Sequence, residues 1–560
     1  MRLTGPEYER FTMRLSLPIE ITTPSDNRSR AIRLICRTKL LWLLYISLIF
    51  TIISCAHDSS MPTESELNQK QQSEGGVSKP TLRKTLPASW DENWFSSPAV
   101  LDINKDGSSE IVASRHSVLY VWKSDGTLLW RAAAGQNASS SNDHGSSRMY
   151  CSPVVGDLNR DGFAEIAIAY SNQVAVYNYK GNLLPGWPRQ YPGSSNEIRS
   201  IAASDVNSDG QCEILVVKTS DGPVTSIFTL DGGLLPGWPQ VANQTDKDKN
   251  DYGGYNQNIG SADLDGDGKR EIICTYDICH IGIFFGDGNS FPANKMFTGK
   301  YSSSVPMFHD IAFAVQGWGP DGKDRDEFTD SPPVFADMDQ DGLPEVILFS
   351  DHEQAGVTAN RGNSLWVLNP DMTRVAGFEK PLTTGMPLYF GYENNIVQVA
   401  PSPCVSFTGG TVPQIIVPSY DGYMRCYSRT GTLLWKLQFD APGGAFIGAS
   451  EAVTGDLNND MLPETVFTTY STQKNCSFLV ILSSSGELLH RLPISGRGCM
   501  AAPTIADVDN DGISEIVISL KDALGNGSGG VQIWDITSAR TSTSDWFTGR
   551  GNYLRTGEHL

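Results

Sequence analysis

Clusters of oxygen-bearing side chains recur seven times along this 560-residue chain, each in the order Asp-x-Asp/Asn-x-Asp-Gly/Met-x-x-Glu. Oxygens at positions 1, 3, 5 and 9 are hard ligands, and calcium is the ion that accepts six to eight of them in flexible geometry. The glycine at position 6 permits the left-handed backbone of a sharp turn. Seven copies are too many for coincidence, so the sequence predicts seven calcium-binding loops.

The predicted calcium ligands are the side chains at positions 1, 3, 5 and 9 of each copy. In chain order they are Asp102, Asn104, Asp106, Glu110, Asp157, Asn159, Asp161, Glu165, Asp205, Asn207, Asp209, Glu213, Asp263, Asp265, Asp267, Glu271, Asp337, Asp339, Asp341, Glu345, Asp456, Asn458, Asp460, Glu464, Asp507, Asp509, Asp511 and Glu515. Met461 replaces the turn glycine in the copy that begins at Asp456, and a strain of about 1 kcal/mol should weaken that site. No catalytic residue and no organic cofactor is predicted.

An EF-hand loop begins with the same spacing, but its last acidic ligand stands at position 12 inside a helix–loop–helix. Position 12 of the first copy is Ala113, which lies in the strand-like run 111–113 (Ile-Val-Ala). The sequence therefore predicts calcium loops between two strands instead of between two helices.

The chain carries 43 basic and 63 acidic side chains, a formal net charge of −20. Without cations, each loop would hold three or four mutually repelling carboxylates. We therefore interpret the acidity as a demand for calcium. Binding of nucleic acid requires a basic face, so it is not expected.

Each loop lies inside a longer unit of short runs that alternate between apolar and polar residues, separated by Gly, Asn and Asp turns. Such runs are typical of antiparallel strands. An additional unit at residues 402–414 keeps the flanking sequence but has Ser406, Thr408, Gly410 and Gln414 at the ligand positions. We expect this sixth unit to fold as a repeat without metal.

Four strands per unit and eight units predict an all-β fold, a β-propeller of about eight four-stranded antiparallel blades. Seven blades is the alternative count. The calcium loops would lie between the first two strands of each blade. Tryptophans recur near the end of several units, at Trp130, Trp187, Trp238 and Trp435. We expect them to pack between neighbouring blades.

The repeated unit resembles the FG-GAP/VCBS-type calcium-binding repeat, the blade found in the head of integrin alpha subunits. The resemblance covers about residues 90–540 and rests on the seven loop motifs quoted above. It implies a propeller whose calcium loops lie on one face. Blades of this type serve adhesion, glycan binding and some polysaccharide lyases, so the resemblance does not select a function.

The N-terminal region predicts export. Residues 40–53 are apolar, follow Arg33, Arg37 and Lys39, and are too few to span a bilayer. Residues 52–55 (Ile-Ile-Ser-Cys) are similar to a bacterial lipobox, which implies lipidation of Cys55; an uncleaved signal anchor is the alternative. We predict an export signal at 1–55 that starts at Met1 or Met13, a flexible polar tether at 56–88, and the propeller at 89–560. The predicted location is the outer membrane or cell surface, with secretion as the alternative.

The functional prediction is a surface-anchored binding or adhesion module. The sequence contains no H-E-x-x-H pair, no G-x-S-x-G elbow and no phosphate-binding loop. Long connections at residues 136–150, 245–258 and 289–330 are rich in Asn, Ser, Asp, Gly and aromatic residues, and loops on a rigid scaffold are where binding usually occurs. The expected partner is an extracellular protein or polysaccharide. A carbohydrate-active enzyme such as a polysaccharide lyase, with His309 and His352 beside the fifth loop, is the alternative.

Overall fold

The computed structural model describes residues 76–88, 93, 95–139, 147–193, 196–241, 252–292, 304–316, 324–353, 361–384, 402–419, 421–440, 447–471, 473–525, 529–540 and 546–559. The predicted export signal with Cys55, and residues 56–75 of the predicted tether, lie outside the described residues. Within the described ranges, no helix has the length and apolar character needed to cross a bilayer.

Alternating runs of β-branched and aromatic residues form the strands, and glycine turns join them. In the first repeat, strands β3 (Glu110–Arg115) and β4 (Val118–Lys123) pair in antiparallel register and are almost wholly buried. Neighbouring sheets cover both faces of each sheet, so the side chains on both faces are apolar. The strands therefore read as nearly continuous hydrophobic runs.

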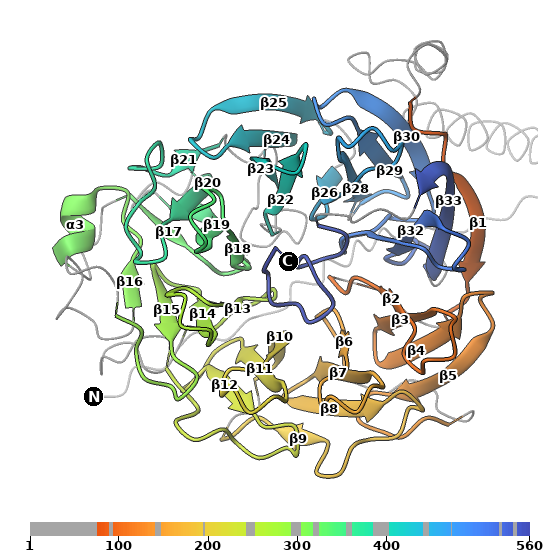
Figure 1. Cartoon of the computed structure of the whole chain (residues 1–560), viewed down its shortest axis with the longest axis horizontal. Coiled ribbons are helices and arrows are strands. Elements are labelled where there is room, and N and C mark those ends of the chain that lie inside the picture. The colour runs from red at the N-terminus through yellow and green to blue at the C-terminus, as the bar shows by residue number, and fades with distance from the viewer. Residues whose placement is uncertain are drawn as a thin grey trace, which may run out of the picture. The chain divides into compact units, whose positions relative to one another are not determined.

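Eight antiparallel sheets surround a common centre, which confirms the predicted all-β propeller and the count of eight blades (Figure 1). Besides β3 and β4, blade 1 contains β2 (Ala99–Leu101) and β5 (Leu128–Ala133); blade 2 contains β6 (Val154–Gly156), β7 (Glu165–Tyr170), β8 (Gln173–Asn178) and β9 (Arg189–Gln190); blade 3 contains β10 (Ile198–Ser204), β11 (Glu213–Lys218) and β12 (Thr225–Phe228); blade 4 contains β13 (Ile259–Ala262), β14 (Glu271–Thr275), β15 (His280–Phe284) and β16 (Ser304–Pro306).

The remaining blades follow the same scheme, with the innermost strand first. Blade 5 contains β17 (Arg325–Glu327), β18 (Val334–Ala336), β19 (Glu345–Glu353), β20 (Arg361–Leu368) and β21 (Leu382–Thr383); blade 6 contains β22 (Cys404–Thr408), β23 (Val412–Pro418), β24 (Tyr423–Ser428) and β25 (Leu433–Gln438); blade 7 contains β26 (Ile447–Ala449), β27 (Val453–Gly455), β28 (Glu464–Ser471), β29 (Ser477–Leu482) and β30 (Leu488–Ile494); blade 8 contains β31 (Thr504–Ala506), β32 (Ile513–Ser519) and β33 (Val531–Arg540).

The fourth strand of blade 8 comes from the other end of the chain. Strand β1 (Thr81–Leu86) pairs antiparallel with β33 and closes the ring (Figure 1). This corrects the predicted boundary, because residues 81–86 belong to the propeller and not to the tether of 56–88. The strand is outermost, so most of its side chains are exposed and polar, and composition alone does not distinguish such an edge strand from a tether.

The hydrophobic core lies between neighbouring sheets and not within one central volume. One buried cluster joins Ile111 and Trp122 of blade 1 to Val517 and Ile533 of blade 8, and similar clusters join other adjacent blades. The recurrent tryptophans reinforce these contacts, as predicted. Their indole N–H groups donate to carbonyls in the next blade, from Trp130 to Tyr179, Trp187 to Leu230, Trp238 to Gly286 and Trp435 to Ser484, at 2.8–3.2 Å.

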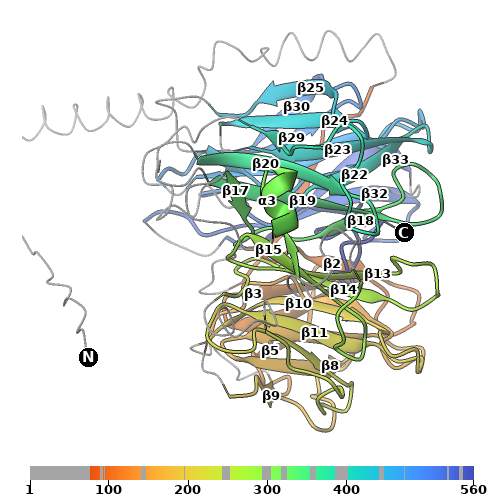
Figure 2. The same cartoon turned by 90° about the vertical axis from the view of Figure 1, so that its left-hand side faces the viewer.

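One short helix, α3 (Ile311–Gln316), occurs among the described residues, in the connection from blade 4 to blade 5. It lies at the outer rim of the ring in Figure 1 and in front of β19 in the side view of Figure 2. The same connection contains β17, which extends the sheet of blade 5 by pairing with the end of β19.

The C-terminal segment, residues 546–559, fills the centre of the ring (Figure 1). Backbone N–H groups of six innermost strands donate to its carbonyl oxygens: Val155 to Tyr553, Ala203 to Leu554, Ser261 to Thr556, Phe335 to Gly557, Thr454 to Trp546 and Ile505 to Phe547. These bonds join strands from around the ring to a single segment.

Candidate functional site

The seven acidic loops each connect the innermost strand of a blade to its second strand, as the sequence predicts. In blade 4, for example, the loop follows β13 and precedes β14. The innermost strands all run in the same direction, because every blade repeats the same strand order. All seven loops therefore lie on one face, called here the loop face.

Hydrogen bonds give every loop the same internal geometry. The aspartate at position 1 accepts the backbone N–H of position 6, at 2.9 Å from Gly268 to Asp263. The glutamate at position 9 accepts the N–H of position 2, at 2.8 Å from Leu264 to Glu271. These bonds aim the remaining carboxylate oxygens at the middle of the loop, where a hard cation would bind.

Position 6 has a left-handed backbone in all seven loops. The six glycines there have φ between 84° and 97°, and Met461 has φ of 67°. The Met461 side chain is 80% exposed, so nothing packs on it to offset the steric cost of this conformation.

The residue at position 3 divides the loops into two classes. Where it is asparagine, its amide donates to the glutamate at position 9, at 2.8–3.4 Å for Asn104, Asn159, Asn207 and Asn458. Where it is aspartate, carboxylates face each other instead. The oxygens of Asp263, Asp265 and Glu271 lie within 4.8 Å of one another, and those of Asp337, Asp339 and Glu345 do the same.

The position 9 glutamates are buried beside other carboxylates, so ionisation is costly for them. Burial first, and the neighbouring aspartates second, raise the pKa of these side chains above the usual 4.5. The pKa is raised to about 7 for Glu110, Glu165, Glu213, Glu271, Glu345 and Glu515, and to about 8 for Glu464. A divalent cation would remove this penalty.

The acidic loop of blade 8, which begins at Asp507, already has a cation beside it. Arg83 of β1 donates to Asp509 at 2.7 Å and to Glu515 at 2.8 Å, and it pairs with Asp535 at 2.5 Å. The strand that closes the ring therefore also neutralises two of the predicted ligands of this loop. In this loop the carboxylates that converge are Asp507, Asp509 and Asp511.

The sixth unit folds as a blade but has no loop of this kind. Ser406 pairs across the ladder with Gln414, and Thr408 pairs with Val412, so the two strands continue to a short turn at Gly409 and Gly410. The positions aligned with ligands thus lie in strands and not around a cavity.

Contacts along the loop face link one blade to the next. The residue at position 4 reaches the following blade in four places: Arg160 to Asp205 at 3.5 Å, and Gln340 to Thr411, Asn459 to Ser538 and Asn510 to Gly107, each at 2.7 Å. The geometry of one loop is therefore coupled to that of its neighbour. The last of these contacts joins blade 8 to blade 1.

The C-terminal segment closes the centre of the ring with two buried arginines. Arg555 is fully buried and donates to five oxygens, those of Pro153, Thr548, Gly549, Ser97 and Pro98, at 2.7–3.4 Å. Arg550, also fully buried, donates to Ser402 at 3.1 Å. A planar guanidinium suits this role, because it can donate in several fixed directions at once.

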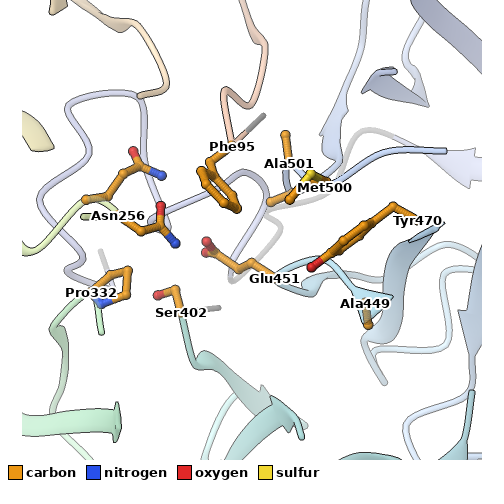
Figure 3. Close-up of a pocket in the computed structure, with 11 residues that line it drawn as sticks. Phe95, Asn256, Pro332, Ser402, Ala449, Glu451, Tyr470, Met500 and Ala501 are labelled. Atoms are coloured by element: carbon orange, nitrogen blue, oxygen red, sulfur yellow. The ribbon is translucent and has the colours of Figure 1, made fainter. Parts of the chain in front are cut away.

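A small pocket opens at the centre of the ring, on the face opposite the loops (Figure 3). Its lining residues mostly precede the innermost strands, whereas the acidic loops follow them. Glu451 lies in the interruption between β26 and β27, and its carboxylate points into the pocket between Phe95, Asn256 and Ser402 (Figure 3). Because the pocket volume is about 20 Å³, it accommodates a water-sized group and not a sugar ring.

The polar side chains that line this pocket are Glu451, Asn256, Gln257, Ser402 and Tyr470. One oxygen of Glu451 accepts the Trp546 indole N–H at 2.9 Å and the Arg550 backbone N–H at 2.7 Å. The side-chain carbonyl oxygens of Asn256 and Gln257 are buried without a hydrogen-bond partner. Burial raises the pKa of Glu451 to about 7, against the opposing effect of the two arginines. The pocket therefore favours a group that donates hydrogen bonds.

The sequence analysis did not anticipate the C-terminal segment or Glu451 at the centre of the ring. It did single out His309 and His352. The C-terminal segment carries no repeat motif, although its glycines and arginines after the last strand were a signal. Glu451 has no sequence signature, because a break in the innermost strand places it. His309 and His352, which were noted beside the fifth loop, do come together, but at the opposite end of β19 from that loop.

Comparison with protein families supports the assignment of the repeat. Residues 102–168 and 157–216 match the model of the FG-GAP-like repeat. No curated protein matches the chain by sequence. Solved structures that are similar include the V. cholerae biofilm matrix protein Bap1 (13% identity, TM-score 0.41, 84% of this chain and 93% of that chain) and BamB from Moraxella catarrhalis (12%, 0.45, 83% and 100%). Sqt1 from Saccharomyces cerevisiae is another (10%, 0.45, 82% and 99%). The chain thus contains FG-GAP-like repeats in an eight-bladed propeller, and these distant likenesses carry no functional argument.

Proposed function

We propose that this eight-bladed propeller of FG-GAP-like repeats is an exported, surface-anchored module that binds an extracellular protein or polysaccharide. Calcium in the seven acidic loops would hold the ring rigid. Lipidation at Cys55 would anchor the chain to the outer membrane or cell surface. The proposal assigns different roles to the two faces of the ring, with ions on the loop face and ligand on the opposite face.

The single observation that carries the proposal is the central pocket opposite the loops. Asn256 and Gln257 are 6% and 5% exposed, and each has a buried carbonyl oxygen without a partner. Burying such a group without a hydrogen bond costs about 1–3 kcal/mol, and a ligand that donates to it recovers that cost. Glu451 adds a carboxylate beside them.

The size of the pocket limits what enters it. A hydroxyl or ammonium group at the tip of a larger ligand would fit, and the rest of the ligand would lie over the surrounding surface. Connections into the innermost strands begin and end on this face, and the long Asn- and aromatic-rich stretches of the sequence fall within several of them. They are the natural source of further contacts.

Calcium is supported by the chemistry of the loops. Twenty-eight side chains with oxygen ligands occupy equivalent positions, and seven glutamates are buried at a cost that a divalent cation would remove. Extracellular calcium is concentrated enough to fill sites of modest affinity.

The test is a glycan and protein array probed with the full chain in calcium and in chelator. We expect a ligand that binds in calcium and weakens at least tenfold on Glu451→Gln, a change that keeps the oxygen accepting from Trp546 and Arg550. Ser406→Ala, in the sixth unit, is the matched control and should bind normally. A ligand whose binding is unaffected by both chelator and Glu451→Gln would contradict the proposal.

A further inference from the structure

A second cluster of ligand-type side chains lies on blade 5, away from the acidic loops. Its members come from three adjacent segments: His309 follows β16, Asp324 precedes β17, and His352 belongs to β19. The backbone N–H of His309 donates to the carbonyl of Asp324 at 3.1 Å, and β17 pairs with β19 so that Asp326 stands opposite His352. Neighbouring strands therefore bring these side chains together on one surface.

The distances in this cluster suit a metal ion. One ligand atom from each of His309, Asp324 and His352 lies within 4.8 Å of the other two. The two imidazole rings have centroids 4.6 Å apart and an interplanar angle of 23°. The two rings are stacked, which brings a nitrogen of each within reach of one ion bound at the edge of the pair.

Asp326 holds one of the histidines in position. Its carboxylate is completely buried and accepts from Ser364 at 3.1 Å and from the indole N–H of Trp366. Nε2 of His309 lies 3.0 Å from the same carboxylate. Because the carboxylate is an acceptor, Nε2 meets it with an N–H, which leaves the lone pair of the ring on Nδ1. Metal-binding histidines are oriented in this way by a carboxylate on their other nitrogen.

Contacts of Arg374 and Trp366 also fix the backbone and ring of His309. Arg374 donates to the carbonyl of His309 at 2.8 Å and also to that of Phe308, while its guanidinium lies 4.9 Å from the ring of Trp366. The His309 ring in turn meets the Trp366 ring edge-on at 5.8 Å. Of the three ligand residues, Asp324 is exposed and the two histidines are half-buried. The cluster is therefore built around a rigid histidine with access from solvent.

We propose that His309, Asp324 and His352 bind a divalent transition-metal ion, with zinc the best fit. Imidazole nitrogens suit zinc and its neighbours, whereas calcium takes oxygen ligands. The site is distinct from the fifth calcium loop, because His352 stands seven residues along β19 from Glu345, about 23 Å at the usual rise of a strand. Two histidines and one carboxylate leave coordination positions open for water or a ligand atom.

The ion would join the connection between blades 4 and 5 to the body of blade 5. His309 and Asp324 belong to that connection, and His352 belongs to the sheet. The site lies at the end of β19 remote from the loop face, on the side where the central pocket opens. An open coordination position there would accept a carboxylate or hydroxyl group from a bound partner.

The test is a titration of the full chain with zinc alone, after removal of metals and in a large excess of calcium that keeps the acidic loops filled. We expect one equivalent to bind tightly, and cobalt at the same site to show the visible absorption bands of a nitrogen-ligated ion. His352→Ala and Asp324→Asn should each weaken binding at least tenfold. Asp326→Asn, which changes only the positioning residue, should weaken it by about 10–100-fold.

Asp310→Asn is the matched control, because Asp310 is an exposed carboxylate next to His309 but outside the cluster. It should bind zinc like the unchanged chain. Asp324 is exposed, so Asp324→Asn should keep the melting temperature of the zinc-free protein and separate ligation from folding. Absence of a saturable equivalent in excess calcium, or equal affinity in Asp324→Asn and Asp310→Asn, would overturn the proposal.

Discussion

Replacing Asp265 with asparagine tests whether the loop carboxylates exist to bind calcium. Asp265 lies within 4.8 Å of Asp263 and Glu271, and its Oδ1 accepts the N–H of Asp267 at 3.2 Å. Asparagine keeps that acceptor and removes one charge, and four other loops of the chain use asparagine at this position. The substitution therefore changes charge with little change in shape.

Substitution of Asp265 should lower the melting temperature in calcium but not in chelator. For sites with dissociation constants of about 10⁻⁴–10⁻³ M, calcium at about 10 mM stabilises the fold by about 1.4–2.7 kcal/mol per loop. Loss of a charged ligand removes part of this, and Asp265→Ala removes more, lowering the melting temperature of a fold of this size by about 1–3 °C. In chelator, both variants should melt at or above the temperature of the unchanged chain, because a repelling carboxylate is gone.

The pH dependence of stability follows from Glu271 in the same loop. Raising the pKa of Glu271 from 4.5 to about 7 corresponds to about 3 kcal/mol of unfavourable ionisation in the folded state. Without calcium, the folded state binds this proton more tightly than the unfolded chain does. The contribution of Glu271 to the stability of the calcium-free protein is therefore greatest below about pH 4.5 and is lost as pH rises through 7. With calcium, the carboxylate must be ionised to bind, so the gap between loaded and chelated protein should widen from pH 6 to pH 8.

Differential scanning calorimetry of the unchanged chain, Asp265→Asn, Asp265→Ala and the control Ser406→Ala would measure these effects. Chelation should lower the melting temperature of the unchanged chain by many degrees, and Ser406→Ala should follow it in both conditions. If Asp265→Asn lowered the melting temperature equally in calcium and in chelator, the carboxylate would be a structural hydrogen-bonding group and not a calcium ligand.

Four further predictions concern other parts of the molecule. Met461→Gly should raise the melting temperature slightly, by relief of about 1 kcal/mol of backbone strain, and should tighten calcium binding at that loop; an unchanged calcium titration would contradict this. Arg555→Lys should destabilise the propeller by several kcal/mol in chemical denaturation, because one ammonium cannot replace five guanidinium bonds, and a loss below 1 kcal/mol would refute the role given to the C-terminal segment. Binding of a donor group in the central pocket should strengthen as pH rises through about 7, where Glu451 ionises, and Glu451→Gln should flatten that profile. Incubation with a panel of polysaccharides should release no unsaturated products, and product formation that is lost in His309→Ala would replace the binding module by a lyase.

The features that repeat along the chain can be predicted from the amino-acid sequence. Seven copies of one nine-residue pattern fix the loops and the strands on either side of them, because each copy folds by local rules of turn geometry and alternation, and the ligand-free unit at 402–414 raises the expected number of blades to about eight. The departures were visible too: Met461 in place of the turn glycine, and the missing ligands of the sixth unit, are single residues at known positions. Repetition makes such local signals reliable.

The features that occur once in the molecule could be seen only in the folded chain. The pairing of β1 with β33, the burial of Arg555 among oxygens from several blades, and the meeting of His309 with His352 all join residues distant in the chain. The repeat pattern does not indicate which of these residues meet. Ring closure accounts for the first two, because a closed circle brings the first strand to the last sheet and the inner strands to one centre, whereas pairing of β17 with β19 brings the two histidines together.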